Sequence, residues 1–380
     1  MELPLEGLVV LEFSQYLSGP SAALRLADLG ARVIKIEKPN GGDAGRKLAI
    51  KNLWADDSSL LFHTINRNKE SFTADLKNAD DIVLVKKLIK KEDVLIHNFR
   101  PGVMDKLGLG YTTAKEINPR IIYAKISGYG KEGPWKNKPG QDLLLQSMTG
   151  LAYTTGDGNN GPVPFGIAIG DILCGAQLVQ GILAALIRRQ KTGTGALIEV
   201  SLMESLLDFQ FELLTTYFTN NKQPQRSINN NGHTLLGAPY GLYKTADGFI
   251  ALAMMDITEL TKAIDCLELK DFSNEQIFSK REEIKTILAA HLIKHISSYW
   301  IEQLHECGLW AMEVLDWEQM INNEAYKVLQ MEQPLHIGDK EFMTTRCPIR
   351  INGERLYADK AAPKLGEHKR SILEELIIKN

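Results

Sequence analysis

One alternation of elements near the start of the chain restricts the fold more than any other feature of the sequence. Residues 8–13 form an apolar run interrupted by Glu12, which is typical of a strand buried on both faces. Pro20 suits the first turn of a helix, residues 22–29 have helical spacing, and a second apolar run follows at 32–37. A strand, a helix and a strand in this order favour a parallel, doubly wound sheet.

The same alternation continues to residue 218. It predicts further helices and strands, in chain order, at 80–91, 94–97, 121–126, 142–148, 171–189, 197–201 and 203–218. A polar stretch rich in Asn begins at Thr219 and is interpreted as a linker, and a strand pair at 240–243 and 249–253 lies beyond it. We therefore predict a Rossmann-like α/β domain at 1–218, a linker and a small α+β domain at 219–330, and a return to the large domain at 331–380.

Charge and composition bear on the partners and the compartment. The 44 basic and 47 acidic residues give a net charge of −3, which provides no field for nucleic acid. The acidic N-terminus leads directly into a strand pattern and does not resemble a signal peptide. The longest apolar stretch, 169–187, is interrupted by polar residues and falls short of the ~18 apolar residues of a membrane span. We expect a cytoplasmic protein that binds neither nucleic acid nor membrane.

The four cysteines are far apart and form no CxxC pair. This usage is typical of a reduced compartment without structural disulfides, and no His, Cys and carboxylate spacing indicates a metal site.

A loop rich in Gly, Asn and Pro, at 151–166, precedes the long apolar helix. It carries Asp157 among residues too small to cover it, and Asp171 lies where the helix begins. Binding and catalytic groups concentrate on exposed loops held by rigid elements. We therefore interpret this loop as the place where the chemistry occurs.

Several segments, in order along the chain, carry a resemblance to a known family. They are LSGPSAALRLADLGARVIKIEKPNGGD at 17–43, NRNKESFTADLK at 66–77, VLIHNFRPGVMDKLGLGY at 94–111, ISGYGKEGPW at 126–135, RRQKTGTGALIEVSLMES at 188–205, APYGLYKTADGFIALA at 238–253 and APKLGEH at 362–368. Together they resemble the class III CoA-transferases, the CaiB/BaiF-like family that includes formyl-CoA transferase and carnitine CoA-transferase.

The resemblance implies a fold, an assembly and a reaction. The large domain is made from both ends of the chain, the small domain is inserted, and two subunits interlock as a homodimer. The reaction is transfer of CoA from an acyl-CoA donor to a free carboxylic acid, with CoA as substrate and no permanently bound cofactor. A carboxylate nucleophile opens the thioester, and an enzyme anhydride and an enzyme–CoA thioester follow. Such a site needs an ionised acid, donors for the oxyanion and exclusion of water.

The nucleophile position departs from the family. Counting back from Asp171 places the nucleophile of formyl-CoA transferase at Asn159, whose amide cannot perform this attack. The nearest carboxylate is Asp157, and we predict it as the nucleophile. The alternative is that Asp157 only caps its turn, as Asp before Gly often does. Asp142 and Asp171 stand at helix starts and are expected mainly to cap or to occupy a first turn.

Two other functions stay open. The α-methylacyl-CoA racemases of this family use a His and an Asp at the separation of Gln141 and Asp171, but glutamine cannot act as a proton base. A non-catalytic acyl-CoA-binding homologue is the other alternative, and Asn159 motivates it.

The resemblance also implies ligand contacts at the carboxyl ends of the strands, where doubly wound sheets bind nucleotides. The positions that match the nucleotide and pantetheine path are Lys38, Lys77, Asn98, Phe99 and Lys106. Each lysine is suited to a CoA phosphate, although a solvated surface charge is the alternative for each. Gln15 and Tyr129 are expected to face the acyl group. Leu17 replaces a glutamine of formyl-CoA transferase, which argues against oxalate or formate, but the sequence names neither donor nor acceptor.

Overall fold

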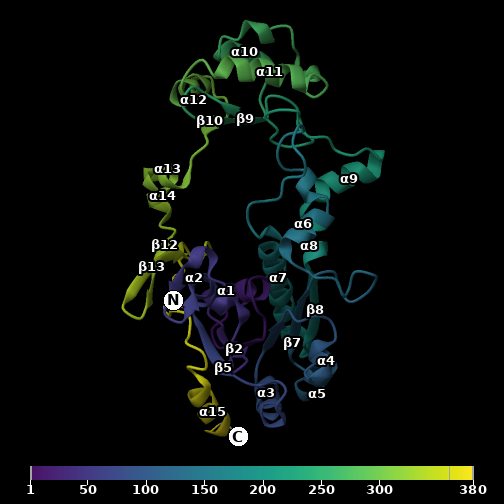
Figure 1. Cartoon of the computed structure of the whole chain (residues 1–380), viewed down its shortest axis with the longest axis vertical. Coiled ribbons are helices and arrows are strands. Elements are labelled where there is room, and N and C mark those ends of the chain that lie inside the picture. Colours follow the sequence, from purple (N-terminus) through teal and green to yellow (C-terminus); the bar gives the residue numbers. More distant parts are fainter. Residues whose placement is uncertain (1, 359, 379–380) are drawn as a thin grey trace. The chain divides into compact units, whose positions relative to one another are not determined.

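The computed structural model describes residues 2–358 and 360–378 (Figure 1). Contacts divide the chain into two compact units. The first comprises Met1–Leu145, Ile167–Asp208 and Leu329–Asn380, and the second comprises Gln146–Gly166 and Phe209–Val328. The division differs from the predicted large domain at 1–218, because 146–166 and 209–218 group with the second unit.

A six-stranded parallel sheet forms the centre of the first unit. Its strands are β1 (Val9–Glu12), β2 (Arg32–Glu37), β5 (Lys69–Thr73), β6 (Val94–His97), β7 (Ile122–Ser127) and β8 (Ala196–Ser201). Their spatial order is β5-β2-β1-β6-β7-β8, and every neighbouring pair is parallel. The chain therefore starts in the middle of the sheet and winds outward in both directions, which is the order of doubly wound sheets. The parallel sheet predicted from residues 8–37 is confirmed.

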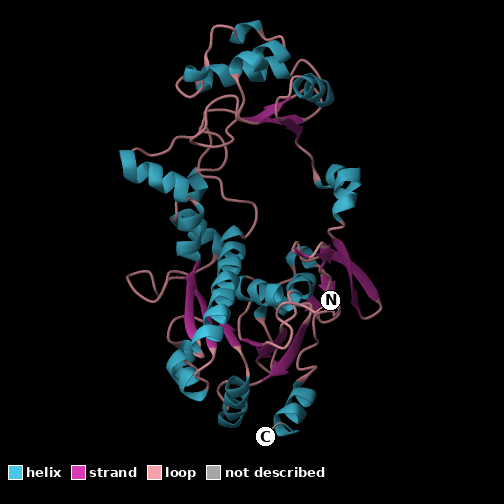
Figure 2. Cartoon of the chain, turned by 180° about the vertical axis from the view of Figure 1, so that it is seen from behind, coloured by secondary structure: helices cyan, strands magenta, loops and turns pink. Residues whose placement is uncertain are grey.

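Helices pack on this sheet. Helix α1 (Ser18–Asp28) lies against α7 (Ile169–Thr192), and both contact the strands (Figure 2). A Cβ on Gly175 of α7 would lie 2.7 Å from the Ser18 carbonyl oxygen, so glycine permits the close approach of the two helices. A core cluster joins Leu11 and Leu95 to the helices α3 (Ala79–Lys91), α5 (Tyr111–Ile117) and α15 (Lys369–Ile378).

Helix α7 is long and apolar enough, by length and composition alone, to cross a membrane. This differs from the sequence expectation, because the helix continues past the C-terminal end of the stretch at 169–187 and has 24 residues. Several of its side chains, such as Leu178 and Ile182, are fully buried within the first unit. A core helix passes the same test of length and composition, so the finding is weak evidence for a membrane.

The second unit contains a three-stranded antiparallel sheet in the order β11 (Ala311–Glu313), β10 (Phe249–Leu252), β9 (Gly241–Lys244). The strand pair predicted at 240–243 and 249–253 is confirmed. Tyr243 and Ile250 point into a core shared with the helices α10 (Ile257–Ala263), α11 (Arg281–Leu292) and α12 (Ser297–Glu306). Side chains alternate along a strand, so Leu242 and Met312 lie on the other face of the sheet and are exposed.

The described chain also contains other α-helices and short strand pairs. The helices are α2 (Leu60–Asn66), α4 (Val103–Lys106), α6 (Asp142–Met148), α8 (Leu202–Phe209), α9 (Phe211–Asn220), α13 (Trp317–Asn322) and α14 (Glu324–Leu329). The strand pairs are β3 (Trp54–Ala55) with β4 (Ser58–Ser59), β12 (Glu332–Ile337) with β13 (Lys340–Thr345), and β14 (Arg350–Ile351) with β15 (Glu354–Arg355). One predicted helix, 203–218, is wrong as a single element. It breaks at Gln210, whose ψ of 22° departs from helical geometry and whose side chain donates to the carbonyl of Thr149.

Candidate active site

The carboxyl edge of the parallel sheet gathers most of the residues predicted to contact CoA. Parallel strands end at a common edge, so loops after neighbouring strands lie together. The predicted residues follow β5, β2, β1, β6 and β7, respectively: Lys77, Lys38, Gln15, Asn98 with Phe99, and Tyr129. Lys106 ends the short helix α4 after β6.

Asn98 holds the loop that carries Gln15. Its Oδ1 accepts the main-chain N–H of Gln15 at 2.9 Å, and its Nδ2 donates to the carbonyl of Gln15 at 2.7 Å. Both polar atoms of the Asn98 side chain therefore engage the loop after β1. Contact between Asn98 and CoA stays a prediction.

Buried charges hold the neighbours of Gln15. The ammonium group of Lys35 donates to the carbonyl of Ser14 at 2.8 Å, and Oδ1 of Asp43 accepts the main-chain N–H of Tyr16 at 3.2 Å. Tyr16 has a φ of 65°, a left-handed conformation that few residues other than glycine adopt. The loop after β1 is thus fixed by side chains at three consecutive residues.

The buried charges are paired with one another. Glu12 lies 3.0 Å from the Lys35 ammonium and 2.8 Å from that of Lys69, and all three side chains are at most 1% exposed. Burial alone would raise the pKa of Glu12, but the two ammonium groups outweigh it and lower that pKa to about 2. Burial lowers the pKa of Lys69 to about 8 against the attraction of Glu12.

The remaining predicted residues of the sheet edge differ in exposure. Lys38, Lys77 and Lys106 are exposed, which leaves their charges accessible to a phosphate. Phe99 is half-buried with its ring 6.0 Å from that of His97. Tyr129 donates from its hydroxyl to the carbonyl of Pro139 at 3.0 Å.

Asp157 belongs to the second unit and is half-buried. Its Oδ1 accepts the main-chain N–H of Asn231 at 2.8 Å. The loop is tied to the same segment twice more, since Asn231 donates from Nδ2 to the carbonyl of Gly156 at 3.2 Å and Gly158 donates to the carbonyl of Ser227 at 2.7 Å. A carboxylate held in this way is ordered and still partly open to solvent.

The other two acids lie at the starts of helices. Oδ1 of Asp142 accepts the main-chain N–H groups of Gly170 and Asp171, at 2.7 and 3.2 Å, and so caps the start of α7. Burial, together with repulsion from Asp142, raises the pKa of Asp171 to about 6, while a hydrogen bond with Ser18 opposes the shift. Asp142 also stands in the first turn of α6 and Asp171 in that of α7, which confirms the expected placement.

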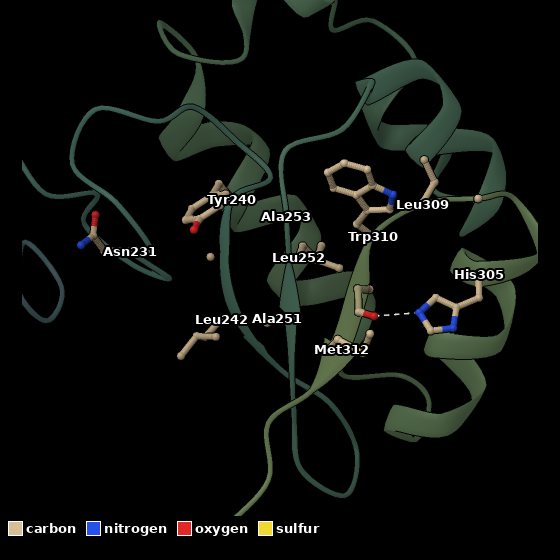
Figure 3. A pocket seen from close by; sticks show the side chains of 14 residues that line it. Asn231, Tyr240, Leu242, Ala251, Leu252, Ala253, His305, Leu309, Trp310 and Met312 are labelled. Atoms are coloured by element: carbon tan, nitrogen blue, oxygen red, sulfur yellow. Dashed lines mark hydrogen bonds between the residues drawn. The ribbon is translucent and has the colours of Figure 1, made fainter. Parts of the chain in front are cut away.

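A cavity of about 680 Å³ lies on the second unit, over the exposed face of its sheet (Figure 3). Its apolar lining includes Leu242, Ala251, Trp310 and Met312, and none of its lining residues is a Lys, Arg, Asp or Glu. Asn231 also lines it. The cavity therefore borders the segment that holds Asp157, and its chemistry suits an apolar group.

One group of side chains in the second unit has the spacing of metal ligands: Cys266, Glu268 and His291. Both ring nitrogens of His291 are engaged, one with the carbonyl of Ile264 at 2.8 Å and the other with the Lys294 ammonium at 3.4 Å. A neighbouring cation and an occupied imidazole make these three residues a poor ligand set.

A family model described as CoA-transferase family III matches residues 5–369. The chain belongs to this family. The succinyl-CoA:glutarate CoA-transferase of Mus musculus is 30% identical over 98% of the chain and 86% of the relative. The acetyl-CoA:oxalate CoA-transferase of Acetobacter aceti is 32% identical over 98% of the chain and 95% of the relative.

A crystal structure of a protein from the same family has a similar fold. A CAIB/BAIF family protein from Brucella suis has a TM-score of 0.86 and 30% identity, covering 99% of the chain and all of that protein. The protein is therefore a CoA-transferase of family III, and CoA thioesters are its substrates.

Sequence reasoning missed the residues that hold the site. Asn231 and its neighbour Arg226 lie in the polar stretch that reads as a linker, where one Asn among several carries no distinguishing signal. Lys35 offered a signal, because a charge inside an apolar strand must be paired or solvated.

Proposed function

We propose that this enzyme moves CoA from an acyl-CoA donor to a free carboxylic acid by covalent catalysis on Asp157. The observation that carries the proposal is the hydrogen bond from the Asn231 main chain to Oδ1 of Asp157. It orders the carboxylate on a loop of small residues, and we assign Oδ2 to the attack.

The steps balance without a further reactant. Oδ2 of Asp157 bonds to the thioester carbonyl carbon and the carbon–sulfur bond breaks. CoA leaves as a thiolate, and the acyl group stays on Asp157 as a mixed anhydride. The thiolate then attacks the Asp157 carbonyl carbon, which releases the donor acid and leaves an aspartyl–CoA thioester. The carboxylate of the acceptor attacks this thioester and displaces the CoA thiolate, which leaves a mixed anhydride of Asp157 and the acceptor. The thiolate then attacks the acyl carbon of the acceptor, which gives the new acyl-CoA and frees the carboxylate of Asp157.

The sheet edge of the first unit supports binding of CoA in this proposal. Lys38, Lys77 and Lys106 are exposed cations suited to its phosphates, and Phe99 offers a ring beside its organic part. Gln15 and Tyr129 are assigned to the acyl end. By family resemblance, the enzyme acts as a homodimer. Its four separated cysteines suit the reduced cytoplasm, and its net charge of −3 favours neither nucleic acid nor an anionic membrane.

Relatives suggest which substrates to test. Their names give succinyl-CoA and acetyl-CoA as donors and glutarate, oxalate or citramalate as acceptors. The uncharged cavity beside Asn231 suits the apolar part of an acid, so monocarboxylic acids belong in the panel as well.

The test is formation of new acyl-CoA from each donor and acid, separated by chromatography. We expect transfer in the wild type and loss of at least about 1,000-fold in Asp157→Ala, since a missing nucleophile removes the covalent route. An Asp157→Ala enzyme that stays fully active contradicts the assignment. Exchange of the α-proton with deuterated water without CoA transfer favours the isomerase, and CoA binding with neither activity favours a binding protein.

A further inference from the structure

The loop that carries Asp157 has little means of ordering itself. Residues 155–161 include three glycines and two asparagines, and no large side chain packs the loop from within. Glycine increases the conformational entropy that an ordered loop must lose. The contacts that hold this loop therefore come from elsewhere in the second unit.

Arg226 closes the loop at its two ends. Its Nη1 donates to the carbonyl of Thr155 at 2.6 Å and to that of Gly161 at 3.1 Å, while Nη2 donates to the carbonyl of Asn160 at 2.8 Å. A planar guanidinium presents donors in a rigid fork, which a lysine ammonium cannot reproduce. One side chain thus joins the residues on both sides of Asp157.

The segment that bears Arg226 is itself anchored to helix α11. The ammonium of Lys285, only 1% exposed, donates to Oγ of Ser227 at 3.0 Å and to the carbonyl of Asn230 at 2.9 Å. Glu282 accepts the main-chain N–H of Ile228 at 2.8 Å. The hydrogen bonds run from helix α11 through the segment to the loop.

We propose that Arg226 is a positioning residue, whose guanidinium sets the placement of Asp157 by clamping the loop on both sides of it. The inference rests on the proposed function of Asp157. A displacement of about 1 Å at a reacting group lowers a rate by roughly 100-fold. Arg226 touches only main-chain carbonyls in these contacts, so it acts through the loop.

The experiment compares Arg226→Lys with Arg346→Lys in the full-length enzyme. Arg346 is a matched control, because its guanidinium also donates to three main-chain carbonyls, those of Leu329, Gln330 and Cys347, outside the Asp157 loop. Three quantities are measured: hydrogen exchange of the peptide covering 155–161, the rate of CoA transfer with its KM for acyl-CoA, and thermal stability. Succinyl-CoA or acetyl-CoA, whichever the wild type uses, is the donor.

We expect Arg226→Lys to raise exchange in 155–161 and to lower kcat about 10- to 100-fold, with KM for acyl-CoA within twofold of the wild type. Arg346→Lys should leave exchange in 155–161 and kcat unchanged, whatever its melting temperature. Unchanged exchange in Arg226→Lys overturns the inference, and so does a kcat loss that Arg346→Lys matches at equal stability.

The outcomes separate this inference from the proposed function. Hydrogen exchange reports whether Arg226 orders residues 155–161, even if another acid is the nucleophile. An active Asp157→Ala enzyme overturns only the proposal that Asp157 is the nucleophile. Raised exchange in 155–161 of Arg226→Lys together with an unchanged kcat overturns the positioning role of Arg226.

Discussion

Asn231 donates its main-chain N–H to Oδ1 of Asp157 at 2.8 Å, across 74 residues of sequence. The bond ties the loop before α7 to the segment before β9 within one compact unit. Because the donor is a backbone group, the orientation of the carboxylate depends on the path of both segments more than on the side chain at 231. The path of the backbone is therefore the sensitive quantity.

Gly158 tests how closely the two segments must approach. A Cβ at Gly158 would lie 3.1 Å from the carbonyl oxygens of Arg226 and Ser227, whereas one at Gly161 would meet nothing within 4 Å. Gly158→Ala should lower kcat at least about 10-fold and cost about 1–2 kcal/mol of unfolding free energy. Gly161→Ala should stay within about 0.5 kcal/mol of the wild type. Equal effects of the two substitutions would contradict the close packing of Gly158 against the segment at Arg226 and Ser227.

Substitution of Asn98 tests whether its side chain orders the loop after β1. Replacing it by alanine removes both hydrogen bonds to Gln15, which should cost about 1–3 kcal/mol and raise KM for acyl-CoA. Chemical denaturation and initial-rate kinetics measure the two effects. Asn40→Ala, at an exposed position, is the control. An Asn98→Ala enzyme with unchanged stability and KM would show that this loop is ordered by other groups.

The raised pKa of Asp171 predicts that the stability of the protein depends on pH. Its pKa of about 6 in the folded protein exceeds the ordinary 3.8, so folding favours the protonated acid. The stability that it contributes is full below about pH 4 and is lost as the pH rises through 6. Asp171→Asn should therefore gain about 1–3 kcal/mol relative to the wild type between pH 4 and pH 7.5. Urea unfolding at both pH values measures this gain, and a constant difference would contradict the raised pKa.

The three exposed lysines at the sheet edge predict a salt-dependent KM. Single substitutions of Lys38, Lys77 or Lys106 by alanine should raise KM for acyl-CoA about 3- to 10-fold, leave kcat unchanged, and weaken the dependence on ionic strength, because a phosphate contact in water is screened by salt. Lys340→Ala, at an exposed lysine on β13, is the control. A lysine that behaves like this control is a solvated surface charge.

The cavity of the second unit predicts a change in acid preference. Ala251→Phe places a ring in the cavity and should raise KM for the larger acids about 10-fold while sparing the smallest. Ala246→Phe, in the exposed turn between β9 and β10, is the matched control. A uniform effect on all acids would show that the cavity does not receive them.

The sheet was predictable because its signals are local. Apolar strands and intervening helices repeat through the first part of the chain, and the order of the strands follows from winding outward on both sides of β1. The break at Gln210 was not predictable, because Gln210 contacts Thr149, which lies 61 residues away in sequence. Helical periodicity on both sides of Gln210 hides a contact of that kind.

The candidate site was predictable only in part. Asp157 stood out as the carboxylate in a loop of small residues, and the lysines stood out through family motifs. The partners of Asp157 did not, because main-chain hydrogen bonds such as that of Asn231 leave no mark on residue type. Arg226 and Lys285 are ordinary surface residues in the sequence, and only the folded chain turns them inward to Thr155 and Ser227.

In the proposed mechanism, Asp157 carries CoA during turnover as a thioester. The wild type is incubated with succinyl-CoA or acetyl-CoA, treated with hydroxylamine or borohydride, and analysed by intact mass and peptide mapping. We predict a modification that depends on acyl-CoA, lies on Asp157 and is absent in Asp157→Asn. Modification of Asp142 or Asp171 instead, or none with a donor that the enzyme turns over, would contradict the claim.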